Sequence, residues 1–178
     1  MKKLMVILAA VALAGATQAA TMTWSALNLG AVGAQEGWCV ALYDSGVAFD
    51  GAAAQAGTLT ALYSGSVTAS GTILKAGTSG NNNPAGNAFA SGDSISAYAV
   101  IFNAANIADA TEVLVSAARS ATVNAQGANI TLAFGNAAAT LATANAFVGA
   151  TWAAVPEPTS GLLMLVGLGA LALRRRRA

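Results

Sequence analysis

SISAYAVIFN, residues 94–103, is the strongest strand candidate in the chain. It is rich in β-branched and aromatic residues, and the turn-forming residues Gly92, Asp93 and Asn103 bound it. Similar apolar runs between Gly, Ser, Asn and Asp clusters predict further strands at residues 38–47, 58–68, 112–117, 129–134 and 151–155. The pattern predicts an all-β fold: a small β-sandwich, jelly-roll-like or immunoglobulin-like, with an open barrel as the alternative.

The segments between these strands are less regular. Alanine-rich residues 104–118 have a helical alternative, but Thr111, Val113 and Val115 alternate as in a strand. We expect a helix or loop only at residues 104–110. A second short helix is possible near residues 52–55.

Two similar heptapeptides lie twenty residues apart: ALYDSGV at 41–47 and ALYSGSV at 61–67. We interpret them as two strands of one sheet that share turn chemistry, with turns at residues 44–46 and 64–66. A repeat array is the weaker interpretation, because such arrays need about three copies to be stable. TSGNNNPAG at 78–86 is predicted to be a plain exposed loop.

The chain has 178 residues, of which 56% are hydrophobic and only 8% charged. Without the two end segments described below, about 135 residues remain, enough for one domain. In this body six acids stand against two bases, Lys75 and Arg119, which gives a net charge of −4. Nucleic-acid binding requires clustered Lys and Arg, so no nucleic-acid partner is expected.

The residue types of the body leave little catalytic chemistry. The chain has no histidine, which excludes His-based triads and His-ligated metals. Cys39 is the single cysteine, so no intrachain disulfide can form, and we expect a buried, inert thiol. The acids are interpreted as turn and solubility residues, with a loop calcium site or a catalytic carboxylate pair as weaker alternatives. They are Glu36, Asp44, Asp50, Asp93, Asp109 and Glu112. We predict no enzyme, and no catalytic, cofactor-binding or metal-binding residues.

Six large aromatic residues could serve the core or a ligand. We expect them in the core, since an alanine-rich fold needs large apolar side chains. In an exposed row they would instead stack on sugar rings, and the body would be a polysaccharide-binding module. These residues are Trp24, Trp38, Trp152, Tyr43, Tyr63 and Tyr98.

The chain begins MKKLMVILAAVALAGATQAA. Two lysines precede an uninterrupted apolar stretch at residues 4–14, and Thr17 and Ala19 are small residues at the −3 and −1 positions of a cleavage site. This pattern predicts a helical signal peptide over residues 1–19, removed after Ala19 by signal peptidase.

The chain ends VPEPTSGLLMLVGLGALALRRRRA. The two prolines prevent a helix through their position, and an uncharged apolar run predicts a transmembrane helix over residues 160–173. The positive-inside rule keeps the arginines in the cytoplasm and the body outside. The parts of this tail are Val155, Pro156, Glu157, Pro158, the apolar run, and Arg174, Arg175, Arg176 and Arg177.

This tail resembles the PEP-CTERM sorting signal of Gram-negative bacteria, which has the same three parts in the same order. The resemblance implies processing by an exosortase-type enzyme. It also implies passage through the inner membrane with the body in the periplasm, and delivery to the cell surface or extracellular matrix. Exopolysaccharide is a further partner that it suggests. A permanent membrane anchor is the alternative reading of the tail.

The resemblance covers only the tail and says nothing about the body. We therefore expect a signal peptide at 1–19, a β-sandwich body at 20–154 and a sorting tail at 155–178. For the body we predict a structural or interaction role without catalysis.

Overall fold

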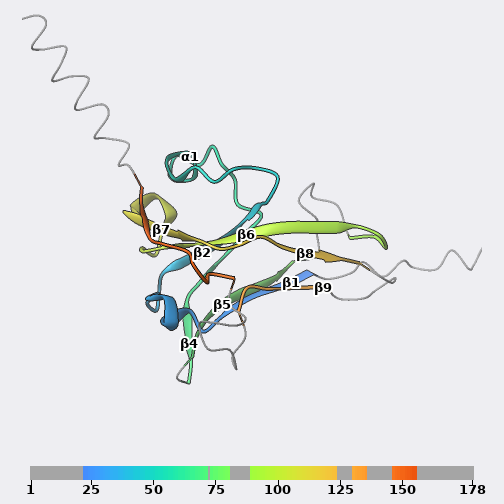
Figure 1. Cartoon of the computed structure of the whole chain (residues 1–178), viewed down its shortest axis with the longest axis horizontal. Helices are drawn as coiled ribbons and strands as arrows, with labels where there is room; N and C mark the ends of the chain where they lie inside the picture. Colours follow the sequence, from blue (N-terminus) through green and yellow to red (C-terminus); the bar gives the residue numbers. More distant parts are fainter. Residues whose placement is uncertain (1–21, 72, 81–88, 124–129, 136–145, 156–178) are drawn as a thin grey trace, which may run out of the picture.

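The computed structural model describes residues 22–71, 73–80, 89–123, 130–135 and 146–155. These residues form strands with little helix, which confirms the predicted all-β class (Figure 1). The elements are, in order, β1 (Met22–Leu27), the 3₁₀ helix η1 (Leu29–Val32), β2 (Cys39–Asp44), α1 (Gly51–Gln55), β3 (Tyr63–Ser66), β4 (Thr68–Ser70), β5 (Ile73–Gly80), β6 (Ser94–Phe102), the 3₁₀ helix η2 (Ile107–Asp109), β7 (Glu112–Val115), β8 (Arg119–Thr122), β9 (Ile130–Ala133) and β10 (Ala153–Ala154).

The strands form two sheets. One has the order β4-β5-β1-β9, and the other has the order β10-β7-β6-β2-β3, with β8 also paired to β6. Neighbouring strands are antiparallel except β1 and β9, which run parallel from Met22↔Ile130 to Ser25↔Ala133. Figure 1 shows the sheet that contains β6 lying over the sheet that contains β1. Whether this arrangement is jelly-roll-like or immunoglobulin-like stays a prediction.

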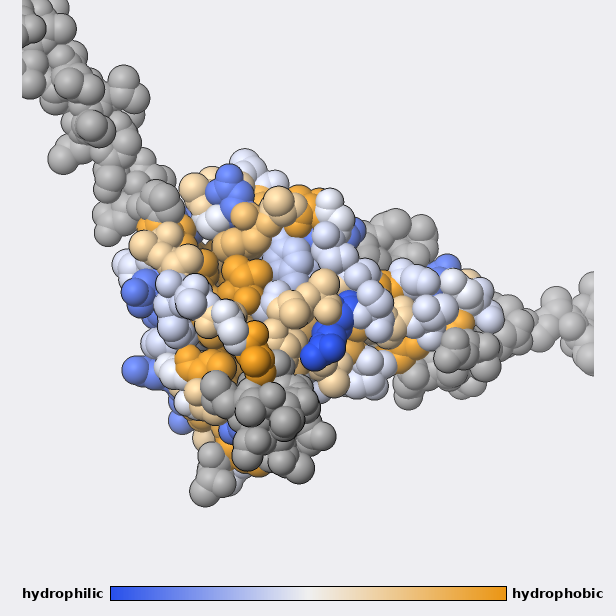
Figure 2. Space-filling model, viewed as in Figure 1, coloured by the Kyte–Doolittle hydropathy of each residue, from blue (hydrophilic) through white to orange (hydrophobic). Residues whose placement is uncertain are grey.

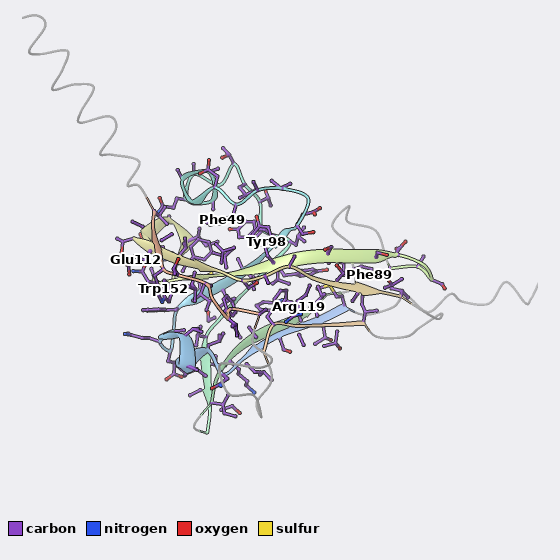
Figure 3. The ribbon with its side chains drawn as sticks, viewed as in Figure 1. Phe49, Phe89, Tyr98, Glu112, Arg119 and Trp152 are labelled. Carbon is purple, nitrogen blue, oxygen red and sulfur yellow. The ribbon has the colours of Figure 1, made fainter. Side chains whose placement is uncertain are left out.

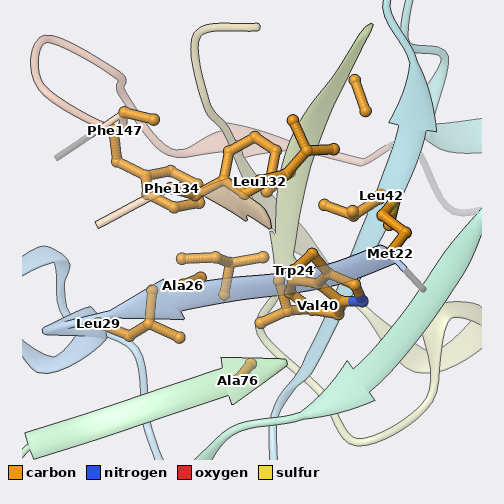
Figure 4. Packing of buried hydrophobic residues seen from close by; sticks show 14 of the residues in the cluster. Met22, Trp24, Ala26, Leu29, Val40, Leu42, Ala76, Leu132, Phe134 and Phe147 are labelled. Atoms are coloured by element: carbon orange, nitrogen blue, oxygen red, sulfur yellow. The ribbon is translucent and has the colours of Figure 1, made fainter. Parts of the chain in front are cut away.

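The inner cluster is the core between the two sheets. Side chains alternate across a strand, so β1 turns every second residue, Met22, Trp24 and Ala26, toward the other sheet. From the facing sheet, Val40 and Leu42 on β2 join them (Figure 4). All of these side chains are buried, so apolar burial between the sheets is the main stabilising contact of the fold.

The outer cluster lies on the opposite face of the six-stranded sheet. There, β6 places Tyr98, Val100 and Phe102 beneath α1 and the loops around it. Since β6 faces a cluster on each side, seven of its nine residues are buried, which explains its near-continuous apolar sequence. The buried members of the outer cluster are Cys39, Ala41, Tyr43, Ala54, Tyr98, Val100, Phe102, Ala110, Val113 and Val155.

Most strand predictions are confirmed. Six predicted runs contain β2, β3, β6, β7, β9 and β10, α1 lies at the expected short helix, and η2 lies within residues 104–110. The two similar heptapeptides also lie in neighbouring strands of one sheet, with Ala41 opposite Ser64.

The turn predicted at residues 64–66 is wrong, because these residues belong to β3. Backbone pairing with β2, where Gly65 lies opposite Val40, holds these residues extended, and a Cβ on Gly65 would meet the Trp24 ring at an ordinary 3.5 Å. The loop predicted at 78–86 is also wrong in part, since its first three residues end β5 and the others lie outside the described residues. All of β1 pairs with residues 75–80 of β5, and this pairing keeps the polar end of β5 extended.

Both predicted end segments lie outside the described residues: the signal peptide at 1–19 and the transmembrane helix at 160–173. Across the part of the chain that is described, no helix combines the length and the apolar character needed to span a bilayer.

Candidate functional site at the junction of body and tail

The last described residues join the edge of the six-stranded sheet. Ala153 and Ala154 form β10, which pairs antiparallel with Val113 and Glu112 of β7. The next residue continues the ladder, because the backbone N–H of Val155 donates to the carbonyl oxygen of Thr111 at 2.8 Å. The chain therefore stays bound to the body as far as Val155, directly before Pro156.

The side chain of Val155 is packed into the body. It is only 5% exposed and belongs to the outer cluster. A Cβ built on Gly51 would lie 3.0 Å from Val155 Cγ1, so α1 begins directly against this valine. The start of α1 is fixed by Asp50, whose carboxylate accepts a hydrogen bond from Ala53 N at 3.0 Å.

Trp152 holds the chain just before β10. Its indole N–H donates to the carbonyl oxygen of Val32 at 3.1 Å, and its ring meets Trp38 edge-on with the centroids 5.6 Å apart. Trp152 packs against the inner cluster, whereas Val155 lies in the outer cluster. The chain thus passes around the edge of the sheet beside β7, where Figure 3 shows Trp152 and Glu112 at the same end of the molecule.

Of the predicted sorting residues, Val155 is the one that the structure describes. Pro156, Glu157, Pro158 and Arg174 to Arg177 lie outside the described residues, as do Thr17 and Ala19 of the predicted signal cleavage site. The strand predicted at residues 151–155 contains β10, so the sequence did indicate that the junction is extended. It did not indicate that this strand pairs with β7 or that Val155 is buried against α1, because both are contacts between distant residues.

The acids of the body act in turns and caps. Asp44 accepts from Gly46 N at 2.8 Å, Asp93 from Ala90 N at 2.9 Å, and Asp109 from the Asn106 side chain at 2.8 Å. Among the described residues, no three His, Cys, Asp or Glu side chains come together as a metal site would require. Figure 2 shows strongly hydrophilic residues scattered over the face in view, among pale and apolar surface.

Cys39 lies in the outer cluster with 8% of its surface exposed, as expected for a buried thiol. Burial raises the pKa of this thiol above its usual range. The protonated thiol is the poorer nucleophile, which suits a packing role.

The large aromatic residues do not form an exposed row. Trp24, Tyr43 and Tyr98 are buried. Three others, Trp38, Tyr63 and Trp152, are partly buried against the inner cluster. These rings mainly fill the two clusters, as the sequence predicted.

The comparisons with known proteins concern the same end of the chain. Residues 154–177 match the family described as the PEP-CTERM protein-sorting motif. The tail is a PEP-CTERM sorting signal. No curated protein and no solved structure matches the chain.

The PEP-CTERM match begins at Ala154, which is the second residue of β10. Two residues of the matched region, Ala154 and Val155, therefore lie in the folded body. No spacer separates the fold from the Pro-Glu-Pro sequence.

Proposed function

We propose that this chain is an exported surface or extracellular-matrix protein that an exosortase-type enzyme sorts through its PEP-CTERM signal. The observation that carries the proposal is the match at residues 154–177, at the very end of the printed sequence and next to a folded body. The signal peptide predicted at residues 1–19 supports the same route.

The route has a defined order. Signal peptidase cuts after Ala19, and the helix predicted at residues 160–173 holds the chain in the inner membrane with the body in the periplasm. The arginine block stays in the cytoplasm because cationic residues resist translocation. Processing near Pro156 then releases the body toward the cell surface or matrix.

We propose a structural or interaction role for the body, a β-sandwich, without catalysis. Three of its acids, Asp44, Asp50 and Asp93, accept hydrogen bonds from nearby backbone N–H groups, an arrangement that stabilises turns and caps. Polysaccharide binding through stacked rings needs rings that face solvent, and the burial of Trp24, Tyr43 and Tyr98 does not favour it.

The test is the mass and location of the native protein. Cells that make it are fractionated, and the intact mass of the protein is measured in each fraction. We expect a surface or soluble form that lacks residues 1–19 and the residues beyond about Pro158. A membrane-bound form that keeps Arg174 to Arg177 would overturn the sorting proposal in favour of a permanent anchor.

A further inference from the structure

The PEP-CTERM match overlaps the fold at residues 154 and 155. The chain is weakly held there, although the side chain of Val155 is buried. β10 has two residues, both exposed, and among the described residues it pairs with β7 alone. Beyond it, Val155 adds one buried side chain and one backbone hydrogen bond. Segments with so few buried contacts open locally far more often than the whole domain unfolds.

If processing takes place near Pro156, as proposed above, the enzyme needs residues 153–155 in an undocked state. An enzyme that cuts or transfers a peptide bond binds the chain on both sides of that bond, with the backbone free to pair with the enzyme. In the folded body, the backbone of residues 153–155 is already paired with residues 111–113. The side chain of Val155 lies against α1, so it is not available to an enzyme pocket either.

We propose that the docking of residues 153–155 on β7 and α1 gates the processing of the sorting signal. The enzyme acts on the fraction of molecules in which β10 and Val155 have left the body, and the docked state protects the junction. This inference rests on the proposed function. It makes the stability of one short strand, rather than the tail alone, a determinant of the processing rate.

Gly51→Ala loosens the junction without changing the tail. The added Cβ would lie 3.0 Å from Val155 Cγ1 and 3.2 Å from Cγ2, so the valine must give way by a few tenths of an ångström. Gly65→Ala is the matched control, because its Cβ would meet the Trp24 ring at an ordinary 3.5 Å, on β3 at the opposite end of the six-stranded sheet from β10. The full chain is produced together with an exosortase, and a pulse-chase follows conversion of the precursor. We expect Gly51→Ala to raise the conversion rate about five-fold or more, on the order of a 1 kcal/mol change in the opening equilibrium, and Gly65→Ala to leave it unchanged.

A disulfide across the junction tests the opposite direction. Ala154 and Glu112 are register partners on antiparallel strands, and both are exposed. Such partners lie close enough for a disulfide, which the oxidising periplasm favours. We expect the pair Glu112→Cys and Ala154→Cys to stop conversion, and a reductant to restore it. The single variant Ala154→Cys controls for the change within the matched region. Recovery of conversion after reduction would show that the locked variant had stayed folded, so global unfolding could not explain the block.

The outcomes separate the two proposals. If the wild-type chain keeps residues 156–178, the sorting proposal fails. If the wild-type chain is processed but neither Gly51→Ala nor the disulfide pair changes the rate, gating is overturned and sorting stands.

Discussion

Tyr43 is a large polar residue held in an apolar place. Its side chain is 1% exposed and stacks on Tyr98, with the ring centroids 6.0 Å apart. Among the described residues its hydroxyl has no hydrogen-bond partner, whereas the Tyr98 hydroxyl donates to Val47 O at 3.0 Å. Burial, with smaller contributions from Cys39 and Tyr98, raises the pKa of Tyr43 to about 12. A buried hydroxyl without a partner destabilises the fold.

Tyr43→Phe removes that hydroxyl and is expected to leave stability at pH 7 unchanged or to increase it by up to about 1 kcal/mol. Tyr98→Phe is the control and is expected to lose about 1 kcal/mol, because its hydroxyl has a partner. Urea unfolding followed by tryptophan fluorescence measures both. A clear loss of stability in Tyr43→Phe would mean that its hydroxyl is bonded.

Tyr43 also predicts that the free energy of unfolding decreases at alkaline pH. The tyrosine of the unfolded chain ionises near pH 10, while in the folded state it keeps its proton to about pH 12. The folded state therefore binds more protons in this window, and stability falls as the pH rises from 10 toward 12, by roughly 2–3 kcal/mol. This fall should be much smaller in Tyr43→Phe. Equal slopes in both proteins would contradict the assignment.

Gly77 shows how closely β5 and β1 approach. A Cβ at this position would lie 2.5 Å from the carbonyl oxygen of Trp24, which is backbone and cannot swing away. We expect Gly77→Ala to destabilise the protein by about 1–3 kcal/mol. Gly30→Ala should stay within about 0.5 kcal/mol of the wild type in the same unfolding experiment. Similar stability for the two variants would show that β5 moves aside at little cost.

At the scale of elements, β7 and β8 pair with two successive parts of β6. β7 pairs with Val100–Phe102 and β8 pairs with Ser94–Ala97, and residues 116–118 bridge the interruption. Ser116, which is 7% exposed, fills the gap: its hydroxyl accepts from Ala99 N at 2.8 Å and donates to Ala117 O at 2.9 Å. Its side chain thus supplies the Ala99 N–H with an acceptor where the strand pairing is interrupted.

Ser116→Ala would leave the buried Ala99 N–H without its acceptor, and we expect a loss of about 1–3 kcal/mol. Ser120→Ala, on exposed β8, is the control and should change stability by less than about 0.5 kcal/mol. Unfolding midpoints in urea compare the two. If Ser116→Ala unfolds at the wild-type midpoint, the connection between β7 and β8 does not depend on the Ser116 hydroxyl.

The strands differ in how well the sequence predicts them. β6 was predictable because its apolar residues fill clusters on both faces. In contrast, β5 carries Gly77 and a polar end, and its strand state depends on pairing with β1, a contact between distant residues. Single-residue patterns carry no information on such pairing. The sorting tail was read from local motifs, but the docking of Val155 on α1 required the fold.

At the scale of the whole molecule, we expect the sorting signal to depend on the positive charge of Arg174 to Arg177. Deleting Arg174 to Arg177 removes the residues that resist translocation. We expect the variant protein to be released or mislocalised, and replacement of the four arginines by lysines to preserve localisation. Cell fractionation with an antibody against the body measures both. Unchanged membrane localisation in the deletion would remove this account of the tail.

The path of residues 152–155 also decides how the molecule bears mechanical load. A pull on the C-terminal end reaches Val155 and β10 first, and a two-residue strand at a sheet edge unzips under little force. Trp152 comes next, and its ring contact with Trp38 and its hydrogen bond to Val32 join the pulled segment to the other end of the described chain. The pulling force therefore reaches the inner cluster, between the two sheets, only after β10 has separated from β7. If the body is held by this end, this order makes residues 153–155 an extensible element in series with a stiffer body.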